Sequence, residues 1–94
     1  MENNYEALEN ILLFKKPAKM LLNLYKNNKS IASRVAKETD ITYSHVVKIF
    51  VMFQKHGLVV FEKIGREKSI ALTYKGKEIA SAIAKIFDIL NKTT

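Results

Sequence analysis

The sequence predicts a single α+β domain that is mostly helical, with one β-hairpin ahead of its last helix. A chain of 94 residues can bury one core only, so residues 1–94 are expected to form one domain. Apolar residues recur at helical spacing through most of the chain, whereas the segment after Gly57 is rich in β-branched and aromatic residues. The predicted order is therefore helix, helix, short link, helix, helix, hairpin, helix.

The first two helices are predicted on either side of Pro17, which is tolerated in the first turn of a helix. The helix before it covers residues 3–15. Its apolar residues at helical spacing are Tyr5, Leu8, Ile11 and Leu12. The helix after it ends at the Asn27–Asn28 pair. Its apolar residues on one side are Leu21, Leu22 and Tyr25.

A brief helix follows a short extended link. The link covers residues 30–32, and the helix covers residues 33–40 and is expected to bury Val35 and Ala36. A tight turn at residues 40–42 separates this helix from the next one.

Residues 43–56 form the longer helix of this pair. Thr42 is a suitable N-cap, because its hydroxyl can accept a hydrogen bond from a free amide of the first turn, and Gly57 is a typical C-terminal stop. Successive residues lie about 100° apart around a helix, which divides this one into two faces. The core face is Val46, Ile49, Phe50 and Phe53. The opposite face is Ser44, Val47, Lys48, Val51 and Lys55.

The hairpin and the last helix complete the fold. Two runs rich in β-branched and aromatic residues are joined by a turn at Gly65–Arg66, which predicts a hairpin over residues 60–71. Thr73 caps a last helix over residues 74–91. Its apolar stripe is Ile79, Ala82, Ile83, Ile86, Phe87 and Leu90.

A short helix, a tight turn, a longer helix and a hairpin make a winged helix-turn-helix arrangement, with its core at residues 17–77. Within it, residues 31–77 resemble the winged-helix core of MarR-type and related archaeal or archaeal-virus transcriptional regulators. The features that carry the resemblance are Val35–Ala36, Ile41–Thr42, Phe53 followed by Gly57–Val59, and Arg66 ahead of the LTxxG run Leu72–Gly76. Ile64 departs from it, because an Asp is common two residues before the wing arginine.

The resemblance implies sequence-specific binding of double-stranded DNA by a homodimeric transcriptional regulator. The helix over residues 43–56 would enter the major groove, and the basic wing over residues 60–71 would lie on the backbone or in the minor groove. The helices over residues 3–15 and 74–91 would form the dimer interface. Its expected residues are Leu8, Ile11, Leu12, Ile79, Ile83, Ile86, Phe87 and Leu90. The alternative is a monomer with both helices folded onto one core.

The expected DNA contacts lie on the outer face of the longer helix, at its start and on the wing. Lys reaches guanine or phosphate, Ser bonds to either, and Val can meet a thymine methyl. A helix start favours phosphate, and a basic hairpin tip can contact phosphate or enter a narrow minor groove. The expected contact residues are Thr42, Tyr43, Ser44, His45, Val47, Lys48, Val51, Lys55, Lys63, Arg66, Lys68 and Arg34. Two alternatives stay open: Val47 and Val51 pack beneath the wing or a partner subunit, and the charges of the wing serve solubility only.

The charge distribution supports a polyanion as partner. The chain has 16 Lys and Arg against 9 Asp and Glu, a net charge of +7. Residues 1–14 carry a net −3, whereas residues 15–29 and residues 42–77 each carry +5. Two further functions fit this surface. One is an architectural DNA-binding protein without sequence preference, and the other is a winged helix that binds another protein.

Other classes of function are not expected. The chain has no cysteine, its two histidines have no partners at metal-ligand spacing, and it has neither a Gly-rich phosphate loop nor a Ser-His-Asp arrangement. We therefore expect no metal, no cofactor and no enzymatic activity. No apolar run approaches the roughly 20 residues that span a bilayer, and the acidic N-terminus is unlike a signal peptide. These observations predict a soluble, cytoplasmic protein that binds no membrane.

Overall fold

The computed structural model describes residues 15–92, which form four helices and one three-stranded antiparallel sheet. In chain order the elements are α2 (Lys15–Asn27), β1 (Lys29–Ile31), α3 (Ala32–Thr39), α4 (Tyr43–Lys55), β2 (Val59–Ile64), β3 (Glu67–Leu72) and α5 (Tyr74–Leu90). The predicted order of helices and hairpin is confirmed, with boundaries that differ by one or two residues. The helix predicted over residues 3–15 lies outside the described residues.

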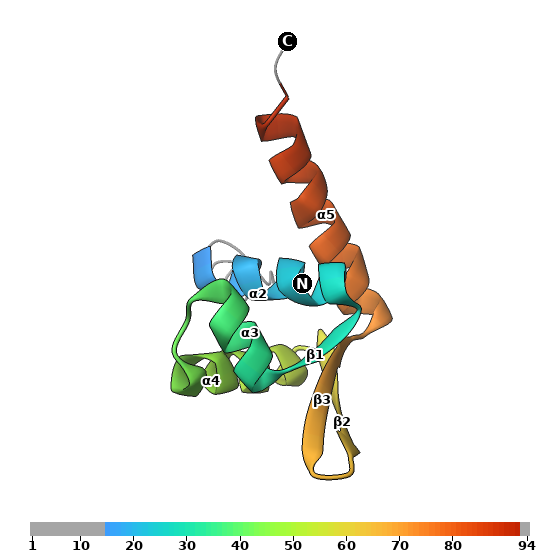
Figure 1. Ribbon diagram of the computed structural model, residues 1–94. Coiled ribbons are helices and arrows are strands. Elements are labelled where there is room, and N and C mark those ends of the chain that lie inside the picture. Colours follow the sequence, from blue (N-terminus) through green and yellow to red (C-terminus); the bar gives the residue numbers. More distant parts are fainter. Residues whose placement is uncertain (1–14, 93–94) are drawn as a thin grey trace.

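Helices α2, α3 and α4 form a body from which the β2–β3 hairpin and α5 extend in opposite directions (Figure 1). One hydrophobic core runs through the three helices and the base of the hairpin. Its largest fully buried side chains are Met20, Leu21, Leu24, Val35, Val46, Phe50, Phe53 and Val59. Burying a side chain of this size contributes about 1.5–3 kcal/mol, so this core dominates the stability of the fold.

The inner face of α2 differs in part from the prediction. Its buried residues are Pro17, Met20, Leu21 and Leu24, which follow the i, i+3, i+4, i+7 spacing of one helix face. Of the three residues predicted on one side of this helix, Leu21 is fully buried, Leu22 is half-buried and Tyr25 is 44% exposed. Tyr25 lies at the edge of the buried stripe, where its side chain reaches solvent.

The predicted extended link is a strand of the sheet. β1 pairs with β3, where Ser30 lies opposite Ile70, and the strand order is β1-β3-β2. The hairpin is therefore attached at its base to the segment that leads directly into α3. This pairing sets the position of the wing relative to the helices.

The ends of α4 agree with the prediction except in one hydrogen bond. Thr42 is the N-cap residue in extended conformation, but its side chain makes no capping hydrogen bond, so the predicted hydroxyl cap is wrong. The first turn is closed by the backbone instead, through the Val46 N–H donating to the Thr42 carbonyl at 2.9 Å. At the other end, Gly57 has φ +75°, the left-handed conformation that favours glycine.

The start of α5 is tied to the turn that follows α4. The Thr73 hydroxyl accepts from the Gly76 N–H at 3.0 Å, which confirms it as a cap, and donates to the Gly57 carbonyl at 2.6 Å. The Thr73 N–H also donates to the Leu58 carbonyl at 3.0 Å. A Cβ at Gly76 would collide with that same carbonyl oxygen. The LTxxG run is thus the joint between the end of α4 and α5.

Candidate nucleic-acid interface

The two faces of α4 are separated as predicted. Its core face is 4% exposed or less: Val46, Ile49, Phe50 and Phe53. Phe50 and Phe53 also meet edge to face, with ring centroids 6.1 Å apart. On the other face Val47 is 37% and Val51 is 55% exposed. Neither valine is buried beneath the wing. The alternative that they pack against a partner subunit stays open.

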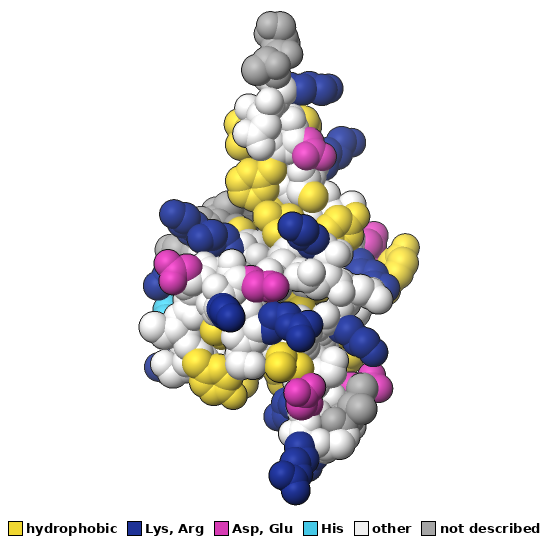
Figure 2. Space-filling view, in the orientation of Figure 1, with side chains coloured by type: hydrophobic (Ala, Val, Ile, Leu, Met, Phe, Trp, Pro, Cys, Tyr) yellow, Lys and Arg dark blue, Asp and Glu magenta, His cyan; other side chains and the backbone are white. Residues whose placement is uncertain are grey.

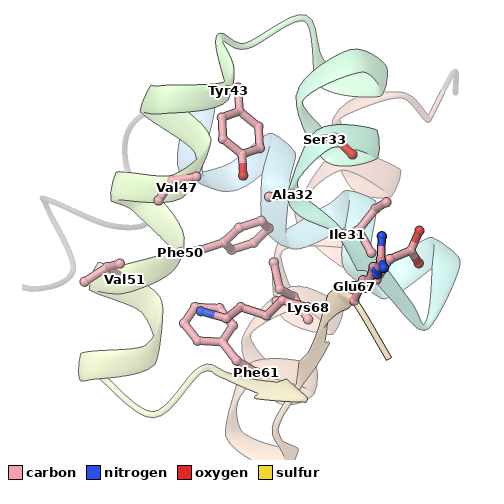
Figure 3. A pocket seen from close by; sticks show the side chains of 12 residues that line it. Ile31, Ala32, Ser33, Tyr43, Val47, Phe50, Val51, Phe61, Glu67 and Lys68 are labelled. Carbon is pink, nitrogen blue, oxygen red and sulfur yellow. The ribbon is translucent and has the colours of Figure 1, made fainter. Parts of the chain in front are cut away.

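A pocket of about 420 Å³ lies between α4, the start of α3 and the wing. Figure 3 shows Phe50 pointing from α4 into the pocket, whereas Val51 lies on the outer side of α4, away from Phe61 of the wing. The lining residues are Ile31, Ala32, Ser33, Tyr43, Val47, Phe50, Val51, Phe61, Arg66, Glu67, Lys68 and Ile70. Helix and wing therefore form two walls of one hollow, and its floor is apolar.

Lys68 is held on the wing wall of this pocket by an aromatic ring. Its Nζ lies 5.1 Å from the centroid of the Phe61 ring, within the range of a cation–π interaction. Phe61 is half-buried, so its ring combines a packing role with this contact. The ammonium group consequently stays near the floor of the hollow and faces α4.

The exposed charges near the pocket are mainly positive. α4 carries Lys48 and Lys55 and no acidic residue. The wing carries three exposed bases and two exposed acids: Lys63, Arg66, Lys68, Glu62 and Glu67. Basic side chains continue to the tip of the hairpin (Figure 2). A hollow with Arg66 and Lys68 on its wing wall, next to the exposed lysines of α4, has a potential that suits an anionic partner.

All twelve predicted contact residues lie in the described part of the chain and are exposed. Five of them line the pocket: Tyr43, Val47, Val51, Arg66 and Lys68. The other seven lie outside its lining: Thr42, Ser44, His45, Lys48, Lys55, Lys63 and Arg34. Sequence reasoning did not single out Phe61, although alternation in β2 could have found it. Val59 and Phe61 lie on one face of that strand, and Val60 and Glu62 are exposed.

Comparison with known proteins gives a close archaeal relative. No family model matches the chain. An uncharacterized protein of Archaeoglobus fulgidus is 34% identical over 88 residues, which covers 88% of this chain and 93% of the relative. The chain belongs to the same family as this archaeal protein. The crystal structure of AF1382 from Archaeoglobus fulgidus agrees, with 33% identity, a TM-score of 0.78, and coverage of 87% of this chain and 96% of that one.

The family has the winged-helix fold of MarR-type transcriptional regulators. Staphylococcus aureus MepR, solved with an oligodeoxyribonucleotide, is 22% identical with a TM-score of 0.77 over 90% of this chain and 65% of MepR. The MarR family regulator SPO1453 from Silicibacter pomeroyi is 20% identical with a TM-score of 0.73 over 92% of this chain and 65% of that one. These matches confirm the predicted fold class and resemblance.

Residues 15–92 contain neither a membrane-spanning helix nor a metal-binding cluster. None of the helices there is both long enough and apolar enough to cross a membrane. Nor does that part of the chain gather three or more His, Asp or Glu side chains where they could hold a metal ion.

Proposed function

We propose that this protein binds double-stranded DNA as a sequence-specific transcriptional regulator. α4 enters the major groove, and the β2–β3 wing lies on the backbone or in the adjacent minor groove. The observation that carries the proposal is the shared hollow, because it aligns the outer face of α4 with the basic side chains of the wing. The structure of MepR with an oligodeoxyribonucleotide supports it from the same fold.

Each group of exposed residues has a distinct role in this proposal. Lys48, Lys55, Lys63 and Lys68 neutralise phosphates, with Lys48 also able to reach a guanine edge. Arg66 enters the minor groove or contacts the backbone. Five further residues are at the start of α4 and α3, where free amides favour phosphate: Thr42, Tyr43, Ser44, His45 and Arg34.

A fluorescence anisotropy titration at several salt concentrations tests this function. The probes are a duplex from the DNA upstream of the protein's own gene and a scrambled duplex of the same composition. Log affinity should fall linearly with log salt, with a slope of about −0.9 per phosphate neutralised, and the upstream duplex should bind more tightly. Equal affinity for both duplexes would indicate an architectural protein. The absence of salt-sensitive binding would favour a winged helix that binds another protein.

We also propose that the protein acts as a homodimer through α5. Near its C-terminal end this helix exposes large apolar side chains: Ile86, Phe87, Ile89 and Leu90. Figure 2 shows apolar side chains gathered along α5. An exposed apolar surface of this kind is characteristic of a protein interface, and a second copy of the chain would cover it.

The dimer interface would also include Ile79, Ile83 and, outside the described residues, Leu8, Ile11 and Leu12. A two-fold dimer would place two α4 helices about one turn of DNA apart, so the operator would be palindromic. Light scattering at micromolar concentration should give the mass of a dimer. A monomer mass would contradict both the dimer and the palindrome.

A further inference from the structure

We infer that the cleft between α4 and the wing selects thymine. The DNA strand that lies in the cleft would present its thymine 5-methyl groups to an apolar stripe formed by Tyr43, Val47 and Val51. This inference rests on the proposed DNA binding and specifies which base the site takes.

The stripe is continuous and accessible. Its three residues follow each other at i, i+4 and i+8, which places them in one row along α4. They are 59%, 37% and 55% exposed, and all three line the pocket. The apolar groups of this row suit the apolar part of a base edge, and in the major groove the largest such part is the thymine methyl.

Apart from the apolar stripe, α4 carries few side chains that could recognise a base through hydrogen bonds. Bidentate recognition of guanine or adenine uses mainly Arg, Lys, Asn or Gln. α4 contains neither Arg nor Asn, and its exposed side chains of this type are Lys48, Gln54 and Lys55. Gln54 and Lys55 stand in the last turn of α4, away from the start of the helix. Lys48 is the one such side chain in the middle of α4, so the choice of base there falls on Lys48 and the two valines.

The opposite wall of the cleft determines which strand meets the stripe. Arg66 and Lys68 line that wall and outweigh the single charge of Glu67 between them, so the wall suits a phosphate backbone. Lys68 is directed into the cleft by its contact with Phe61. A thymine methyl projects into the major groove near the backbone of its own strand. A strand held by the wing thus turns its methyl groups towards α4.

The helix geometry also gives the spacing of the two thymines. Four residues of α-helix rise about 6 Å, close to two base steps of about 3.4 Å each. Val47 and Val51 should therefore meet thymines about two base pairs apart. Removing one methyl-sized group from water corresponds to about fourfold in affinity, so loss of both methyls should weaken binding about fifteenfold.

The test compares thymine with deoxyuridine, which lacks only the methyl group. A duplex is first selected from random-sequence DNA with the full chain, and a copy is made with deoxyuridine in place of the thymines of the half-site. Affinities of both duplexes are measured for the wild type, for V47A/V51A, and for V60A as a matched control. Val60 is 49% exposed on the wing but does not line the pocket.

The expected result is a thymine preference of about fifteenfold in the wild type and V60A, and a preference near one in V47A/V51A. Equal binding of the two duplexes by the wild type would overturn the inference but leave the proposed DNA binding intact. The same holds if V47A/V51A keeps the full preference, since the methyl would then act through DNA shape, or if the selected sites lack thymine. Recovery of no duplex with salt-sensitive affinity would reject the proposed function itself.

Discussion

The outer face of α4 and the far end of α5 are both apolar and exposed, but they differ in charge and in shape. On α4, Val47 and Val51 stand beside Lys48 and form one wall of a hollow whose other wall is the basic wing. On α5, Ile86 and Leu90 are 56% and 72% exposed on a helix that projects from the body. Small aliphatic side chains among basic residues suit a groove of DNA. Larger apolar side chains on a projecting helix suit another apolar surface. Accessible apolar area alone does not identify the partner.

The largest effect is expected when the apolar surface of α5 is removed, which tests whether this surface binds a second copy of the chain. I86E/F87E should convert the dimer to a monomer and weaken binding to a palindromic duplex by about 10²–10⁴, because the second half-site is no longer held in place by the first. Light scattering and anisotropy measure the two effects. K85E is the matched control, since it adds an acid to the same helix without removing an apolar group. A double variant that stays dimeric would contradict the assignment of α5.

The next effect concerns Gly76, where the start of α5 packs against the turn that follows α4. G76A should lower the free energy of unfolding by about 3 kcal/mol, because the added methyl meets the Leu58 carbonyl and the backbone must shift. G65A serves as a comparison. Its Cβ meets open space, and only the positive φ of +63° is unfavourable, at about 1–2 kcal/mol. Urea unfolding measures both, and equal losses would show that the contact with Leu58 does not constrain the joint.

Substitution of two neighbouring valines compares how much the inner and outer faces of α4 contribute to the free energy of unfolding. V46A should lower the free energy of unfolding by about 2 kcal/mol, because Val46 is fully buried. V47A should change it by less than about 0.5 kcal/mol, because Val47 is partly exposed on the outer face of α4. Thermal or urea unfolding of the two variants provides the measurement. A large loss in V47A would mean that this valine packs in the fold and is not available to a partner.

The smallest expected effect concerns the wing. R66A should make the salt dependence of DNA affinity shallower by about 0.9 in slope, because one phosphate contact is lost. K77A, which removes a base from the first turn of α5 outside the hollow, should leave the slope unchanged. If R66A keeps the full slope, the charge of the wing serves solubility and not DNA contact.

Local signals in the sequence were sufficient for most of the fold. The phase of Val46, Ile49, Phe50 and Phe53 correctly divided α4, and Gly57, Gly65 and Thr73 marked the ends of elements. These features depend on neighbouring residues only. The same holds for the hairpin, whose strands and two-residue turn are adjacent in the chain.

Contacts between distant segments were harder to predict. β1 was expected to be a link because it is only three residues long, and its strand character comes from β3, about 40 residues later. The hydroxyl of Thr42 had the right position for a cap but makes no capping bond, since sequence position does not determine a rotamer. The pocket could not be predicted from the sequence either, because its walls come from two separate segments of the chain, α4 and the wing. The roles of its residues towards DNA stay predictions.

The most direct test of the DNA-binding face is a titration of K48E against a selected duplex at low salt. Lys48 is exposed on the outer face of α4, and reversing its charge should abolish detectable binding while far-UV circular dichroism stays unchanged. K77E carries the same change of charge in the first turn of α5 and should bind with nearly the affinity of the wild type. Unchanged affinity in K48E would contradict the account, because α4 would then not be the helix that enters the major groove.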